Sequence, residues 1–350
     1  MNIILIILVF GVIVFFHEFG HFIVAKMNKI AVMEFSIGMG PAIFSVKKKE
    51  TKYSLRLLPI GGYCMMMGED GESEDENAFN NKPLLARILV IAAGPVFNFI
   101  LAFLFSIILI HFTGCDPAKL TYVASDSAAA DAGIEVGDTV TEINGKNIYN
   151  YREILLYMQA EDTSKPVTLG IRHEDGTESS VLVTPKKNSE GEYKLGVAGG
   201  YVASTGIGND IKYAGLELRY WVKATVTGLR MIVTGGVKNG DVMGPVGVGS
   251  AMNDVIEEAK DISTSKKEAT INVLLNLLNW CILLSVNLGI MNLLPIPALD
   301  GGRLLFLFIE GIRRKKIPQD KEAIVNAIGF VLLMILMVVV FFNDIKNAFF

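Results

Sequence analysis

Four long apolar runs divide the chain, and they are residues Ile3–Val24, Ile88–Phe112, Val273–Ile296 and Ile324–Phe342. A helix of about 20 apolar residues is long enough to cross the hydrocarbon core of a bilayer. Each run therefore predicts a membrane-spanning helix. The first run has no basic segment before it and no small-residue cleavage site after it, so we expect an uncleaved helix rather than a signal peptide.

The segment between the first two runs has a different pattern. Residues Phe35–Tyr63 are interrupted by glycine and proline, and Ile43–Val46 and Lys52–Leu58 are predicted to be strands of a hairpin around the Lys47–Glu50 turn. Non-helical backbone at membrane depth is tolerated only against protein or a water-filled cavity. The pattern is thus compatible with a membrane-associated hairpin beside the helices or with a cytoplasmic surface hairpin.

A more polar segment separates the second and third runs. Lys119–Ala198 has the short alternating strands and turns of a small β-rich domain, with a helix expected at Tyr151–Gln159. Tyr213–Val233 has the spacing of an amphipathic helix. We expect the glycine-rich stretch Gly235–Gly249 to be a loop and Asp254–Lys260 to be a short polar helix.

These patterns give a polytopic α-helical membrane protein with four transmembrane helices, a membrane-associated β-hairpin and one inserted domain. The expected divisions are 1–114 for the first half of the membrane domain, 115–199 for the inserted domain, 200–270 for a linker with an amphipathic helix, and 271–350 for the second half of the membrane domain.

Composition agrees with a membrane protein and adds an orientation. The chain is 51% hydrophobic and 19% charged, and its mean hydropathy is +0.43. Lysine and arginine concentrate between the first and second runs and between the third and fourth, which predicts that both segments are cytoplasmic. Both termini and residues 116–272 are then extracytoplasmic. The lipid bilayer is the expected partner of the apolar runs, and no nucleic-acid partner is predicted.

The first apolar run contains His17-Glu18-Phe19-Gly20-His21, an H-E-x-x-H sequence. On a helix, His17 and His21 lie one turn apart on one side, so both imidazoles can bind one metal ion. Glu18 lies beside them, where it could take a proton from a water molecule at that metal. The alternative is a pair of helix histidines with ordinary hydrogen bonds. The three cysteines are far apart and predict no metal site.

A catalytic zinc generally has a third protein ligand, and Asp300 is the best candidate. It follows Pro295 and Pro297 at the inner end of the third run, and Gly301 and Gly302 let the chain turn there. The predicted topology places Asp300 at the depth of the two histidines. An unpaired aspartate is costly in a bilayer, and a metal ion would supply its partner. Its alternative role is to cap the helix that begins near Arg303.

Three segments together resemble the site-2 protease family of intramembrane zinc metalloproteases, in its bacterial regulator-of-sigma-E branch. They are the H-E-x-x-H sequence, Gly94-Pro95-Val96-Phe97-Asn98 in the second run, and the stretch from Asn292 to Gly301. The similarity covers essentially the whole chain. Ser127–Gly145 also resembles part of the PDZ domain that these enzymes carry, and this chain has room for one such domain.

The resemblance implies a role for each residue of the site. His17, His21 and Asp300 would bind Zn²⁺, and Glu18 would be the general base. The Phe35–Tyr63 hairpin would be re-entrant and pair with the substrate. Residues implied to hold the substrate are Asn98, Asn292, Tyr53, Ser54, Leu55 and Arg56.

The function implied by the resemblance is cleavage of transmembrane segments of single-span membrane proteins, near their cytoplasmic end. Anti-sigma factors already trimmed by a site-1 type protease, or remnant signal peptides, would be substrates in regulated intramembrane proteolysis. The expected location is the bacterial inner membrane, with the PDZ-like domain outside and the active site within the membrane near the cytoplasm. Alternatives are a catalytically inactive PDZ membrane scaffold and a haem or metal transporter that uses His17 and His21.

Overall fold

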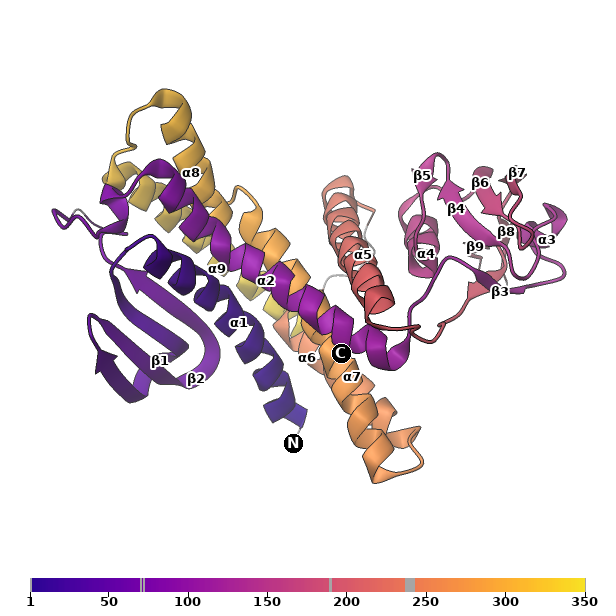
Figure 1. The fold of residues 1–350 in the computed structure, drawn as a ribbon, viewed down its shortest axis with the longest axis horizontal. Coiled ribbons are helices and arrows are strands. Elements are labelled where there is room, and N and C mark those ends of the chain that lie inside the picture. The colour runs from indigo at the N-terminus through magenta and orange to yellow at the C-terminus, as the bar shows by residue number, and fades with distance from the viewer. Residues whose placement is uncertain (1, 70, 72, 189–190, 237–242, 350) are drawn as a thin grey trace. The chain divides into compact units, whose positions relative to one another are not determined.

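The computed structural model describes residues 2–69, 71, 73–188, 191–236 and 243–349. The chain folds into two compact units (Figure 1), one formed by Met1–Phe105 with Lys238–Phe350 and the other by Ser106–Val237. Each unit is described by itself.

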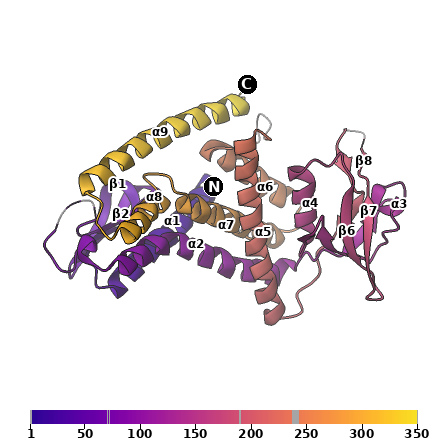
Figure 2. The ribbon, with the colours of Figure 1, turned by 90° about the horizontal axis from the view of Figure 1, so that it is seen from above.

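Four helices are long and apolar enough to cross a membrane, which confirms the four expected apolar helices. They are α1 Asn2–Met27, α2 Leu84–Thr113, α7 Lys266–Leu293 and α9 Gln319–Phe349. Helix α2 begins in the first unit, and its last residues belong to the second. Most of α9 stands clear of the other helices of its unit (Figure 2), and nearly all of its apolar side chains are exposed.

Beside α1 lies a sheet made of two long strands, β1 Val32–Lys48 and β2 Thr51–Met66. These strands are much longer than the two short strands predicted for this hairpin. Each strand bends at its glycine and proline residues, so its two halves form separate rows. The rows run in the order 42–48, 51–56, 32–37 and 62–66. The glycines and prolines that predicted strand ends are thus the points at which the strands bend.

The first unit also contains two shorter helices, α6 Pro245–Asp261 and α8 Asp300–Arg313, and the 3₁₀ turn η1 Phe79–Asn81. The prediction that Gly235–Gly249 is a loop was wrong from Pro245 onward, and residues 237–242 lie outside the described residues. Pro245 occupies the first helical position, where its missing N–H costs nothing. The carboxylate of Asp344 in α9 accepts hydrogen bonds from the N–H groups of Gly244 and Gly247, at 2.9 and 2.8 Å, and so stabilises this helix start.

In the second unit, a four-stranded antiparallel sheet has the order β5-β4-β6-β7, and β10 pairs with β3 and β8 with β9. The strands are β3 Leu120–Val123, β4 Thr139–Ile143, β5 Lys146–Asn147, β6 Val167–Arg172, β7 Glu178–Val183, β8 Lys186–Lys187, β9 Tyr193–Lys194 and β10 Val197–Gly199. The helices are α3 Ala128–Asp131, α4 Tyr151–Ala160 and α5 Ile207–Thr234. Fully buried Glu153 of α4 pairs with Arg219 and Lys223 of α5, so charged side chains hold these two helices together.

Helices α1 and α2 approach each other closely at Gly20. A Cβ atom at this position would lie 2.5 Å from the carbonyl oxygen of Ala93 and 2.9 Å from Cβ of Phe97. Only glycine allows this backbone contact, because the obstructing oxygen is itself part of a helix.

We predict that Gly20→Ala destabilises the protein by about 1–3 kcal/mol, the usual cost of overpacking a rigid contact. Thermal unfolding of the purified protein in detergent measures the change. Gly249→Ala is the matched control, because it also lies in a helix and a Cβ atom there meets nothing within 4 Å. Equal melting temperatures for both variants would contradict the proposed contact.

Candidate metal centre

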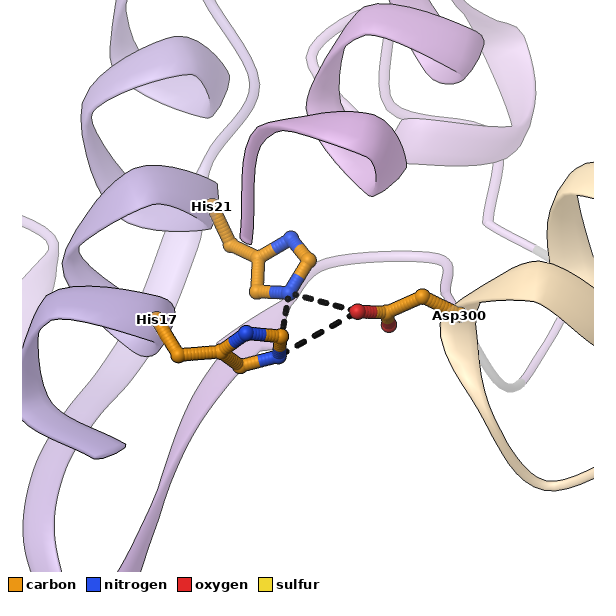
Figure 3. Close-up of side chains that lie close together, drawn as sticks. All are labelled: His17, His21 and Asp300. Atoms are coloured by element: carbon orange, nitrogen blue, oxygen red, sulfur yellow. Dashed lines mark hydrogen bonds and ion pairs between the residues drawn. The ribbon is translucent and has the colours of Figure 1, made fainter. Parts of the chain in front are cut away.

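Three polar atoms from two distant parts of the chain meet at one point (Figure 3). Nε2 of His17 and Nε2 of His21 lie 3.3 Å apart, and Oδ2 of Asp300 lies 3.2 and 3.4 Å from them. Both histidines are buried. The buried Oδ2 atom of Asp300 has no hydrogen-bond donor among the described residues. The structure therefore brings together the three residues predicted to be metal ligands.

The spacing of these atoms fits a tetrahedral zinc ion. Metal–ligand bonds of 2.0–2.2 Å place tetrahedral ligand atoms about 3.3–3.6 Å apart, close to the three distances observed here. Two imidazoles and one carboxylate also form a ligand set of catalytic zinc sites, which keep a fourth position open. The residues present thus fit the ion in both chemistry and geometry.

Helix α2 orients both imidazoles through their other nitrogen atoms. Nδ1 of His21 lies 2.8 Å from the carbonyl oxygen of Val90, which accepts its hydrogen. Nδ1 of His17 lies 3.2 Å from the amide of Asn98, whose Oδ1 is buried and has no donor among the residues that the structure describes. When that oxygen faces the ring, it accepts the Nδ1 hydrogen, and both buried groups are satisfied. Such partners leave Nε2 of each ring to bind a metal.

The packing of both imidazole rings against α2 requires glycine at residue 94. A Cβ atom there would overlap Nε2 of His21 and would lie 2.7 Å from Cε1 of His17. The sequence signal was present in the Gly94-Pro95 pair, which favours close helix contact, but nothing in it indicated that the neighbours were metal-binding rings.

Asp300 is the first residue of α8, and it follows the turn between Leu293, where α7 ends, and the start of α8. Ala298 has a positive φ of 72° in this turn, and the carbonyl oxygens of Leu294 and Ile296 press against Gly301 and Gly302 so closely that a Cβ atom would overlap them. No side chain caps α8, since its N-cap residue is Leu299. The aspartate carboxylate points instead at the histidines.

A cavity of about 470 Å³ opens beside these residues and is also lined by Glu18 and by Tyr63–Met66 of β2. The backbone N–H of Cys64 donates to the carboxylate of Glu18. A Cβ atom at Gly62 would lie 3.3 Å from Cγ of Glu18. Strand β2 therefore fixes the position of the glutamate, a role that the sequence did not reveal.

Of the other residues predicted to hold substrate, Asn292 lies at the metal centre, whereas Tyr53–Arg56 lie within the sheet. Nδ2 of Asn292 lies 3.3 Å from Nε2 of His17, on the metal-binding side of that ring. Tyr53, Ser54 and Leu55 lie in an inner row of the sheet and pair with a row on either side, so their backbone is not a free edge. The row that lines the cavity is the outer one, residues 62–66, and the N–H of Met66 in this row donates to Oε2 of Glu69 at 3.3 Å.

Arg56 belongs to a polar cluster within the sheet. Its guanidinium pairs with Glu34 at 2.7 Å, and Ser54 donates to the same carboxylate at 2.6 Å. Burial by itself would raise the pKa of Glu34, but the hydrogen bonds from Ser54 and Arg56 lower it to about 2. Arg56 thus has an ionised partner within the sheet.

The chain was compared with known families, proteins and structures. Residues 5–336 match Peptidase family M50. A Clostridium acetobutylicum protein is 37% identical, with 98% of this chain and 97% of that protein covered. The regulator of sigma-W protease RasP of Bacillus subtilis is 33% identical, with 98% of each covered. The PDZ domain of the SdrC-like protein from Listeria innocua is 19% identical, with a TM-score of 0.23, over 25% of this chain and 97% of that domain.

We predict that Asp300→Asn lowers the bound metal well below stoichiometry, because the neutral amide is a much poorer ligand than a carboxylate. Metal analysis of the purified protein measures the loss. Asp261→Asn, at the exposed end of α6, is the matched control. Unchanged metal content in the Asp300 variant would remove this residue from the site.

We also predict that Gly94→Ala reduces metal affinity by about 10–100-fold, the range seen when ligand orientation is disturbed. Metal retention during titration with a chelator is the measurement. In the metal-free state this variant should melt closer to the wild type than Gly20→Ala does, because the Gly94 methyl group displaces side chains rather than backbone. Metal affinity equal to that of the wild type would refute the predicted overlap.

Proposed function

The chain belongs to peptidase family M50, whose relatives include zinc metalloproteases, and from this premise we propose that it cleaves peptide bonds within the membrane. His17, His21 and Asp300 bind the zinc ion, and Glu18 is the general base. The observation that carries this proposal is the meeting of three ligand atoms at 3.2–3.4 Å beside a cavity that also contains Glu18.

Zinc bound at this site supplies Lewis-acid activation of the scissile carbonyl and of water. The protein contributes the proton transfers. A carboxylate oxygen of Glu18 accepts a proton from the attacking water and then passes it to the leaving amine. The hydrogen bond from the Cys64 N–H holds this carboxylate in place through both steps. The side-chain amide of Asn292, beside Nε2 of His17, is placed to donate to the oxygen of the scissile carbonyl.

The substrate must lose its helical hydrogen bonds before its carbonyl can be attacked. We propose that the unwound segment adds as a strand to row 62–66 of the sheet, which pairs with another row on one side only and lines the cavity. Backbone hydrogen bonds to this edge compensate for those lost from the substrate helix. In this arrangement Asn98 supports His17, and Tyr53–Arg56 support the edge strand from within the sheet.

The proposed topology follows the positive residues. The basic residues before α2 and between α8 and α9 are assigned to the cytoplasm. Residues 116–272 and both termini are then assigned to the outside. We propose that residues 115–199 form a single PDZ-like domain that excludes bulky ectodomains from the membrane site. Substrates are then single-span proteins already shortened by another protease, such as anti-sigma factors, or remnant signal peptides. The bacterial inner membrane is the proposed location.

We predict that Glu18→Gln lowers the rate of cleavage of a single-span substrate by about 10²–10⁴-fold, the contribution of a general base. The assay uses purified protein with and without a zinc chelator, and cleaved substrate is quantified by mass spectrometry. Metal analysis is the control, because the variant keeps all three ligands and should retain zinc. A zinc-loaded variant that cuts as fast as the wild type would exclude Glu18 as the base.

A further inference from the structure

Helix α8 carries Asp300 at its first residue and presents two unlike faces. On one face, Leu304 and Leu307 are buried in an apolar cluster with side chains of α1, α2 and the sheet. On the other side, Leu305, Phe308 and Ile312 are 42%, 54% and 83% exposed. Their spacing of three and four residues places these side chains in one stripe along the helix. None of the three belongs to an apolar cluster of the described residues.

Basic side chains follow directly on the end of this stripe. Arg313, Arg314 and Lys315 are exposed, and their side chains make no ion pair or hydrogen bond with the residues that the structure describes. The next residue, Lys316, differs because its Nζ donates to the carbonyl oxygen of Asn80. An exposed apolar stripe that ends in unpaired cations is the pattern of a helix lying at the surface of an anionic leaflet.

From this pattern we propose that Arg313, Arg314 and Lys315 form a binding site for the phosphate headgroup of an anionic phospholipid, while Leu305, Phe308 and Ile312 insert among its acyl chains. The inference rests on the proposed function, because it assigns α8 to the cytoplasmic surface of the membrane. Arginine suits this role because its planar guanidinium binds phosphate oxygens in pairs.

The site has a direct connection to the metal centre. Two ion pairs hold helix α8 in place. Glu310 pairs with Arg87 of α2, with Oε2 of Glu310 3.0 Å from Nη1 of Arg87. Arg303 pairs with Glu69 in the segment after β2. Both Arg303 and Asp300 line the 470 Å³ cavity. A lipid that fixes the far end of α8 at the membrane surface therefore limits the tilt of the helix that positions Asp300. Lipid binding should strengthen zinc retention.

The test compares full-length wild type with the triple variant Arg313→Gln, Arg314→Gln, Lys315→Gln. Each protein is equilibrated with mixed micelles of equal phosphatidylglycerol and phosphatidylcholine and washed, and its retained lipids are quantified by mass spectrometry. We expect the wild type to enrich phosphatidylglycerol and the variant to lose most of this enrichment, since each cation removed weakens binding to an anionic surface roughly fivefold. Zinc release to a chelator in phosphatidylglycerol bilayers should be faster for the variant.

The matched control removes the same charge from the β1–β2 turn by Lys47→Gln, Lys48→Gln and Lys49→Gln. Lys49 and Arg314 both have positive φ angles, 54° and 53°, so the two triple variants carry a similar backbone cost. Equal loss of phosphatidylglycerol in both variants would indicate general attraction to basic surfaces and would overturn the inference. Complete displacement of the lipid by inorganic phosphate would also overturn it, because the site would then bind free anions.

Lipid retention and zinc release do not depend on turnover. A wild type that binds phosphatidylglycerol through α8 but cleaves no substrate would contradict the proposed function and leave the lipid site supported. A wild type that cleaves substrate equally in neutral and anionic bilayers, with unchanged lipid retention in the α8 variant, would refute the lipid site alone.

Discussion

The buried carboxylate of Asp300 is the constraint on which the first unit depends. A charged oxygen that is buried without a hydrogen-bond donor is too costly to leave uncompensated in apolar surroundings. Two imidazole nitrogens lie 3.2 and 3.4 Å from it, and they stabilise it either as protonated donors or as fellow ligands of a metal ion. Metal binding and the fold of this region are therefore coupled, because a shared metal ion stabilises the three ligand atoms at the point where α1 and α8 approach each other.

Glycine makes that approach possible, and the two critical glycines act differently. Gly20 lets the backbones of α1 and α2 touch, whereas Gly94 leaves room on α2 for the two imidazole rings. The same helix provides the acceptors that orient these rings, at Val90 and Asn98. Helix α2 thus contributes no metal ligand but determines the positions of two.

The sequence was sufficient where the signal is local. Apolar length predicted α1, α2, α7 and α9, and residue chemistry with predicted topology selected His17, His21 and Asp300 before their geometry was known. It was insufficient where distant pairing decides the structure. The glycines and prolines at which β1 and β2 bend were predicted to end strands, because the hydrophobic periodicity does not show which rows of a sheet pair. Likewise, the helix predicted at Asp254–Lys260 lies within α6, but the start of α6 at Pro245 was missed because it is stabilised by Asp344, about a hundred residues away.

On the proposed function, one strand couples substrate binding to catalysis. The outer row of β2 donates the Cys64 N–H to Glu18, and the same row offers its edge to the substrate. A peptide that pairs with this edge cannot use the Cys64 N–H, which donates to Glu18, or the Met66 N–H, which donates to Glu69, so it must pass beside Glu18 rather than cover it. Its register on the strand then decides which carbonyl lies next to Glu18 and the zinc ligands. Selection of the scissile bond follows from backbone pairing, and a segment that stays helical is not cut because it presents no free backbone groups to the strand.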